Sequence, residues 1–237
     1  MKQESLKALI ENLGQRYSEI LGINLKDGRD DEIFKWFFAS VLFGAPITET
    51  LVIKTYRCFQ KHDVLTPERI LETGWDSLVS ILDEGGYTRY DFKTADKLLE
   101  AMRKLKEHYD GSFNLLHHKA SDSADLENKL KDLGKGIGDV TVSIFLREFR
   151  GVWQKAESNP TNLVILAAKN LAIVEDESAA KALEQLEHFW AGNQVMEESF
   201  VNFETALLRL GKDFCRKKRC ACCPVKSDCM SPHVTDG

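Results

Sequence analysis

Apolar residues recur at intervals of three to four along almost the whole chain, which is the spacing of one face of an α-helix. Sustained alternation of apolar and polar residues, the pattern of a half-buried strand, is hard to find. The pattern therefore predicts an all-α protein. The expected helices cover approximately 5–21, 31–42, 48–60, a short segment from 66, 76–82, 92–109, 123–133, 140–149, 161–171, 177–190 and 197–210.

The ends of several expected helices carry recognisable signals. Asp30 and Asp31 place acids at a helix N-terminus, where they complement the helix dipole. Thr66 followed by Pro67 has the cap-then-proline order that begins a helix. The helix after Asp31 is apolar on most of its faces, so we expect it to be buried.

Composition is that of an ordinary globular protein. The 237 residues are 43% hydrophobic, enough for one large core or two smaller ones. The formal net charge of -5 argues mildly against a uniformly basic nucleic-acid binder, so any phosphate-binding surface must be local. Because no apolar run has the length of a membrane span and the first residues lack signal-peptide order, we expect a cytoplasmic protein without a membrane partner.

Five of the six cysteines fall between Cys215 and Cys229. Cys215, Cys220, Cys223 and Cys229 form the spacing C-x4-C-x2-C-x5-C, which puts four thiolates in one short loop. Such a loop favours a cubane 4Fe-4S cluster, because zinc ribbons and fingers join two ligand pairs across a longer spacer. A tetrahedral zinc site and a set of free structural cysteines are the alternatives.

Two cysteines stand outside this ligand set. Cys222 is able to replace Cys220 or Cys223 as a ligand, but adjacent residues point in different directions, so we expect Cys222 to be the bystander. Cys58 lies among apolar residues of a helix and is expected to be a small buried hydrophobe.

The first interval of the cysteine loop is entirely basic. It consists of Arg216, Lys217, Lys218 and Arg219. A rigid loop with these charges would present a phosphate-contacting surface despite the acidic total. Alternatively, the charges solvate the loop or balance an anionic cluster.

A glycine-rich turn joins two expected amphipathic helices upstream of the cysteines. Its residues are Leu133, Gly134, Lys135, Gly136, Ile137 and Gly138. Glycines allow a tight turn with positive φ and let backbone amides approach a phosphate at the N-terminus of the second helix. A plain helix–helix turn would have the same glycines.

The glycine turn followed by the cysteine loop resembles the endonuclease III-like superfamily of helix-hairpin-helix DNA glycosylases. Residues 39–45 look like the early buried helix of that family, Gly86-Tyr87 like the turn near the lesion, and Leu133 to Thr141 like the hairpin. The last three cysteines have the family spacing, and the first interval is shorter. The resemblance implies a six-helix barrel with the hairpin at 27–152, and a discontinuous helical iron–sulfur domain at 1–26 and 153–237.

The resemblance also implies base flipping and cleavage of an N-glycosidic bond in damaged double-stranded DNA. Bifunctional members use a lysine in the second hairpin helix as a Schiff-base nucleophile, but here that position is Val140. Monofunctional members keep a downstream aspartate, and no aspartate stands in the matching stretch 158–161. Glu157 is the nearest substitute, although an exposed loop glutamate is the commoner explanation.

The loop at 87–91 supplies further candidates. Tyr87 and Arg89 are expected to contact unstacked bases or phosphate, and Asp91 is a candidate acid. A capped turn, with the tyrosines packed on the barrel, is the alternative. In the hairpin, Thr141 is a candidate DNA contact, and Asp139 is either a helix cap or an acid.

The sequence therefore predicts a base-excision repair protein, a monofunctional or atypical DNA glycosylase without lysine-dependent lyase activity. A DNA-binding module that has lost catalysis is the alternative, and a DNA binder that responds to cluster oxidation is a third. The sequence identifies neither the lesion nor a protein partner.

Overall fold

The computed structural model describes residues 1–175 and 178–231. Every regular element in those residues is helical, which confirms the predicted all-α class. The α-helices are α1 (Gln3–Leu13), α2 (Tyr17–Leu21), α3 (Asp30–Phe43), α4 (Glu49–Lys61), α5 (Pro67–Gly85), α6 (Asp91–Tyr109), α7 (Phe113–Lys119), α8 (Ser123–Asp132), α9 (Asp139–Arg147), α10 (Asn162–Asn170), α11 (Ala179–Gly192) and α12 (Phe200–Leu210). Three short turns of helix follow: η1 (Gly211–Cys215), η2 (Cys220–Cys222) and η3 (Lys226–Asp228).

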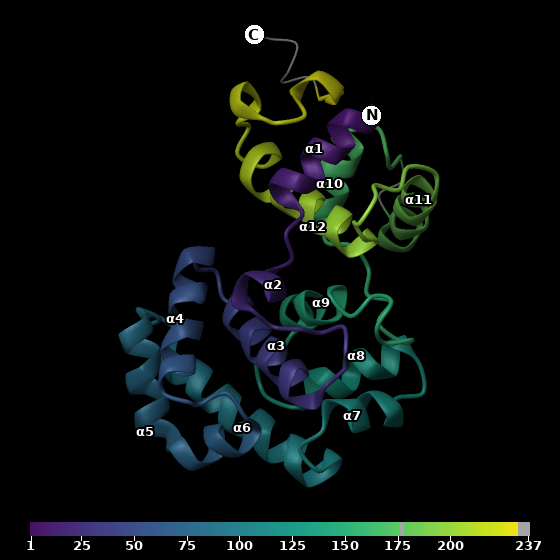
Figure 1. Ribbon diagram of the computed structural model, residues 1–237. Coiled ribbons are helices and arrows are strands. Elements are labelled where there is room, and N and C mark those ends of the chain that lie inside the picture. Colours follow the sequence, from purple (N-terminus) through teal and green to yellow (C-terminus); the bar gives the residue numbers. More distant parts are fainter. Residues whose placement is uncertain (176–177, 232–237) are drawn as a thin grey trace. The chain divides into compact units, whose positions relative to one another are not determined.

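The chain divides into two compact units (Figure 1). The terminal unit consists of Met1–Ile20 and Asn159–Gly237, and the central unit consists of Leu21–Ser158. The sequence placed the boundaries at 27 and 152. The hairpin belongs to the central unit and the cysteine loop to the terminal unit.

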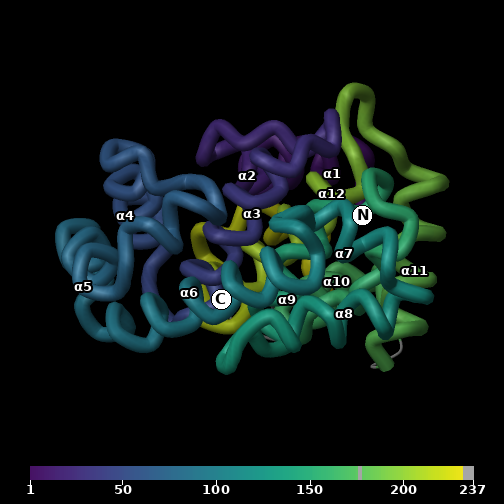
Figure 2. Tube along the Cα trace, turned by 90° about the horizontal axis from the view of Figure 1, so that it is seen from below, coloured from purple at the N-terminus to yellow at the C-terminus, as the bar shows by residue number. Residues whose placement is uncertain are grey.

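In the central unit, α3 lies between α4 and α9 and also contacts α6 and α7 (Figure 1, Figure 2). Its apolar residues are buried on nearly all sides, as the sequence predicts. Trp36 of α3 donates a hydrogen bond from its indole nitrogen to the carbonyl oxygen of Phe145 in α9, at 3.0 Å. This bond and the packed aromatic rings around Phe37 fix α9, and with it one side of the hairpin, on the core.

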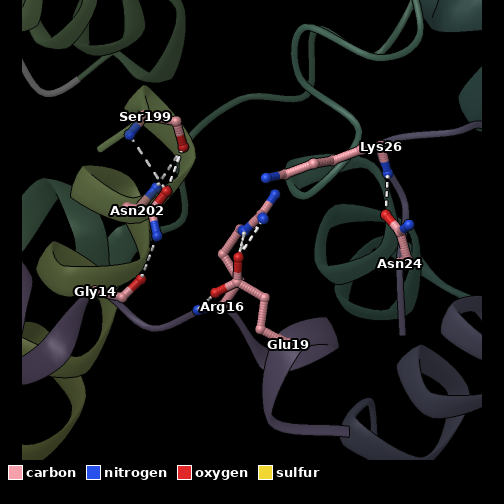
Figure 3. Close-up of polar contacts among 7 residues, drawn as sticks. All are labelled: Gly14, Arg16, Glu19, Asn24, Lys26, Ser199 and Asn202. Atoms are coloured by element: carbon pink, nitrogen blue, oxygen red, sulfur yellow. Dashed lines mark hydrogen bonds and ion pairs between the residues drawn. The ribbon is translucent and has the colours of Figure 1, made fainter. Parts of the chain in front are cut away.

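In the terminal unit, α12 contacts α1, α10 and α11. Its core includes Phe203, whose ring stacks on Trp190 of α11 with centroids 5.5 Å apart. Ser199 and Asn202 form a reciprocal capping box at the start of α12, and the Asn202 amide also donates to the carbonyl oxygen of Gly14, at 3.2 Å (Figure 3). The segment after α1 is thereby attached to the start of the helix that leads into the cysteine loop.

Two helix predictions need correction. The single helix expected at 5–21 is broken, with α1 ending before Gly14 and α2 beginning at Tyr17. Helix α7 was not predicted, because its His117-His118-Lys119 end looks like a polar stretch. The two helices expected after Thr66 are present within α5, where a kink at Gly74 separates them.

The helix expected to start at Glu177 begins outside the described residues, and α11 is described from Ala179. Among the helices in the described ranges, none is long and apolar enough to cross a membrane.

Candidate metal centre and nucleic-acid interface

Helix α12 leads directly into the cysteine loop. It continues as the π-helical turn Gly211–Cys215, which packs against α10. A Cβ atom at Gly211 would overlap the carbonyl oxygen of Leu163 and lie 2.8 Å from its carbonyl carbon. Only glycine permits η1 to pack this closely on the backbone of α10, and the packing places Cys215 next to α10.

The four cysteines with the predicted ligand spacing line one cavity of about 350 Å³. The remainder of the cavity wall is formed by Leu166, Asn170, Phe214, Lys218, Lys226 and Ser231. Cys222 does not line the cavity; it is exposed, with its sulfur 3.6 Å from the carbonyl oxygen of Arg219. The structure therefore separates Cys222 from the other four cysteines, as the sequence predicts.

The thiols of this cavity affect one another. Burial raises the pKa of Cys215 and of Cys223, and negative charge on the neighbouring cysteines of the set raises both further. A hydrogen bond from the Asn170 side chain partly opposes the rise of the Cys215 pKa. The raised pKa favours the neutral thiol at Cys215 and Cys223, whereas a bound metal would favour the thiolates and release protons.

The cysteine loop is attached to the body of the terminal unit at several points. The backbone N–H of Met230 donates to the carbonyl oxygen of Asn170, at 2.6 Å. Asp228 accepts from the backbone N–H of Lys2, at 2.9 Å, and from Ser5. Val225 is fully buried in the unit's core. These contacts attach the loop to α10, to the N-terminal segment and to the core of the unit.

The donor set suits an iron–sulfur cluster, because four thiols line one cavity and each would bind one iron. Within residues 1–175 and 178–231, no group of three or more Cys, His, Asp or Glu side chains is drawn together closely enough to hold one metal ion.

The basic interval of the loop is exposed. Arg216, Lys217, Lys218 and Arg219 all present their side chains to solvent. Lys217 forms an ion pair with Asp213, at 2.9 Å, and the Arg219 guanidinium lies over the Phe214 ring, 5.9 Å from its centroid. The basic surface thus stands beside the cavity, and Lys218 takes part in both.

The glycine turn joins α8 to α9 as predicted. Gly136 has φ +90°, a left-handed conformation that favours glycine. Ile137 is buried and its N–H donates to the carbonyl oxygen of Gly134, at 3.0 Å, while the N–H of Lys135 donates to Glu100 of α6, at 2.8 Å. Gly138 caps α9 and has open space where a Cβ would be. The turn is anchored on one side, and Gly136 and Gly138 are exposed to solvent.

The first residues of α9 differ in exposure. Val140 is 63% exposed, and Asp139 is exposed with its carboxylate 2.6 Å from the Lys131 ammonium. Thr141, which the sequence placed among the DNA contacts, is 4% exposed and packs toward Gly44. Its hydroxyl is therefore turned away from solvent, and the prediction for this side chain is corrected.

The loop at 87–91 is mainly structural. Tyr87, expected at the DNA surface, is fully buried, and its hydroxyl donates to the carbonyl oxygen of Leu42, at 2.8 Å. This corrects the prediction in favour of the packed-tyrosine alternative. Arg89 is exposed, with its guanidinium 5.5 Å from the Tyr90 ring centroid, so it remains available to a ligand.

The candidate acids all have local partners. Asp91 accepts from the backbone N–H of Phe92, at 2.7 Å, and shares a hydrogen bond with Asp83, whose pKa is raised by burial and by the Asp91 charge. Glu157 is exposed and accepts a long hydrogen bond from Ser123, at 3.5 Å. The structure does not bring Asp91, Asp139 and Glu157 together through any of these contacts.

Sequence reasoning missed one residue beside the hairpin. Lys97 of α6 is half-buried, and its Cε atom lies 3.1 Å from the position that a Cβ would occupy at Gly136. Its place in a long amphipathic helix gave no signal of this, because the hairpin lies nearly forty residues further along the chain.

Comparison of the chain with protein-family models and with curated proteins finds no match.

Proposed function

We propose that Cys215, Cys220, Cys223 and Cys229 hold a 4Fe-4S cluster. The observation that carries the proposal is that these four cysteines, and not Cys222, line one cavity. When bound, the cluster supplies four iron–thiolate bonds that crosslink the loop. The protein's own contribution is the close packing of Gly211 on α10 and the hydrogen bonds at Asn170 and Asp228.

We propose further that the protein binds double-stranded DNA through the hairpin and the basic loop. Two features support this: a turn with two exposed glycines at the start of a helix, and four exposed cations beside the cysteine cavity. Together with the resemblance of the sequence to helix-hairpin-helix glycosylases, they favour a two-domain protein of base-excision repair that acts on damaged DNA.

The activity we assign is hydrolysis of the glycosidic bond of a flipped base without a Schiff-base lysine. Val140 takes the place of that lysine in a well-exposed position on α9. The carboxylate that would stabilise the developing positive charge is then one of Glu157, Asp139 and Asp91.

A specific observation favours the second candidate, a DNA-binding module without catalysis. Asp139 is paired with Lys131, Asp91 bonds its own helix and Asp83, and Glu157 bonds Ser123. Each candidate acid therefore has an ordinary structural role at the surface.

The cluster is tested by anaerobic reconstitution followed by absorbance and by iron and sulfide analysis. We expect brown protein with acid-labile sulfide, loss of both signals in the Cys215→Ser, Cys220→Ser, Cys223→Ser and Cys229→Ser variants, and retention in the matched Cys222→Ser variant. Stoichiometric zinc without sulfide would refute the cluster, and loss in Cys222→Ser would refute the ligand assignment.

The activity is tested with a panel of duplexes that each carry one lesion. Strand breaks that require alkali, with no complex trapped by borohydride, are the result expected of a glycosylase without a lysine intermediate. Binding of duplex DNA without processing of any lesion would leave the binding module as the function. Efficient borohydride trapping would contradict the assignment of Val140.

A further inference from the structure

Lys97 lies against the hairpin turn from α6. Its Cε atom is 3.1 Å and its Nζ atom 3.7 Å from the position that a Cβ would occupy at Gly136. Gly136 therefore meets two demands, since a side chain there would have to adopt φ +90° and would also displace the lysine. The end of the Lys97 side chain thus lies in close contact with the turn.

The Lys97 ammonium has no counter-charge in the described part of the chain. No hydrogen bond, ion pair or ring contact of its Nζ atom occurs there, and burial alone lowers the pKa of this group. Glu100, one turn further along α6, already has two other partners. Its carboxylate accepts a hydrogen bond from the backbone N–H of Lys135, at 2.8 Å, and pairs with the Lys104 ammonium, at 2.9 Å. Partial burial of an unpaired charge costs free energy that an anion from outside would recover.

Lys97 differs from the other cations of the hairpin, because Lys131 is paired and Lys135 is exposed. Lys131 lies 2.6 Å from Asp139 and 3.7 Å from Glu127. Lys97 is thus a cation with no internal partner, at the point where the turn is open to solvent. A phosphodiester oxygen is the anion that fits a single ammonium beside glycine amides.

We propose that Lys97 binds the DNA phosphodiester that docks on the hairpin turn at Gly136. This assignment rests on the proposed DNA binding and adds a contact from a helix outside the hairpin. The lysine neutralises the phosphate charge, while the apolar part of its side chain packs against the turn at Gly136.

The test is the salt dependence of binding to an undamaged DNA duplex by the cluster-loaded protein. Lys97→Met keeps the apolar length of the side chain and removes the charge. Because each phosphate contact contributes about 0.9 to the slope of log K against log salt, we expect the slope to fall by about 0.9, so that affinity changes about 3.5-fold less between 50 and 200 mM salt. The matched control is Lys106→Met, which removes a charge from the exposed last turn of α6.

The outcomes separate the two proposals. A slope reduced in Lys97→Met and unchanged in Lys106→Met supports the Lys97 contact. Salt-dependent binding with equal slopes in the wild type and both variants would overturn the Lys97 contact and leave DNA binding intact. Failure of the wild-type protein to bind the duplex would overturn both. If Lys97→Met unfolds, the wild-type Lys97 ammonium is followed by NMR during duplex addition, and an unchanged signal on binding would overturn the contact.

Discussion

The contact between Gly211 and α10 gives the sharpest prediction about the cysteine loop. A Gly211→Ala substitution adds one methyl group where η1 meets the backbone of Leu163. The added carbon would overlap the Leu163 carbonyl oxygen and lie 2.8 Å from its carbonyl carbon and 3.2 Å from its Cα atom. All three atoms are backbone, so no change of rotamer relieves the overlap.

The size of the effect follows from that geometry. Carbon atoms in good contact are about 3.5–4.0 Å apart, so α10 and η1 must separate by roughly 1 Å. Overpacking of a well-packed core costs about 1–3 kcal/mol, and we expect this substitution at the upper end because two backbone segments must move. Since Cys215 and Asn170 lie on the two segments that separate, the cysteine cavity should open as well.

The assay is urea unfolding of the terminal unit, with cluster absorbance measured in parallel. Gly192→Ala is the matched control, because a Cβ at the end of α11 meets nothing within 4 Å. We expect the free energy of unfolding of the control to equal that of the wild type or to exceed it by up to about 1 kcal/mol, since alanine favours a helix more than glycine does. Equal stability and equal cluster content in Gly211→Ala and Gly192→Ala would refute the reasoning.

Three further predictions concern the central unit. Tyr87→Phe should lower the free energy of unfolding by about 1 kcal/mol, because the hydrogen bond to Leu42 is lost. The affinity for duplex DNA should stay unchanged, because the ring is buried. A fall in affinity without a fall in stability would contradict this prediction. Burial lowers the pKa of His117 below 6.5, so this group's stability contribution is fully present above pH 6.5 and is lost as pH falls toward the folded pKa. His117→Phe preserves the stacking on Trp153, whose ring centroid lies 4.6 Å from that of His117. The variant should lose less stability than the wild type between about pH 7.5 and 5.5, as measured by urea unfolding. An unchanged pH profile would refute the assignment. Val140→Lys, at a 63% exposed position, should keep the free energy of unfolding within about 0.5 kcal/mol of the wild-type value. The new lysine should form a complex with abasic DNA that borohydride traps. A stable variant without trapping would place α9 away from the sugar.

Most helices were predictable because their ends carry local signals. Thr48, Thr66 and Thr161 accept hydrogen bonds from backbone N–H groups at the starts of α4, α5 and α10, close to where the sequence placed them. The buried character of α3 follows from the same local information, since an apolar residue occupies nearly every face.

The errors come from contacts between residues far apart in the sequence. Helix α7 looks polar at its end, but Lys155 donates to the carbonyl oxygens of His117 and Ala120, at 2.9 and 2.6 Å, and caps it from outside. Tyr87 stands in a glycine-started loop and would be expected at the surface, yet its hydroxyl has a carbonyl partner in α3. Neither partner is visible in the local pattern, because both depend on how the helices pack.

The four cysteines that line one cavity could be selected from their spacing, whereas Lys97 could not be predicted. Spacing within a short loop limits which thiols face one cavity, and Cys222 lies outside the cavity. Lys97 belongs to the hairpin only through the packing of α6 beneath Gly136. The basic loop is thus recognisable in the local sequence, whereas the proposed Lys97 contact requires the fold of the central unit.

The acidic total charge is compatible with this interface because the charges are segregated. Counted from the sequence, the terminal unit has 12 basic and 14 acidic residues; the segment 212–219 alone holds five of the basic residues and one of the acids. The rest of that unit is therefore left with 7 basic and 13 acidic residues. At physiological salt the screening length is about 8 Å, so a phosphate at the loop would be governed mainly by the nearby cations. A small set of contacts of this kind predicts binding at one local surface, with a salt slope of about 0.9 for each phosphate contacted, rather than the diffuse attraction of a uniformly basic protein.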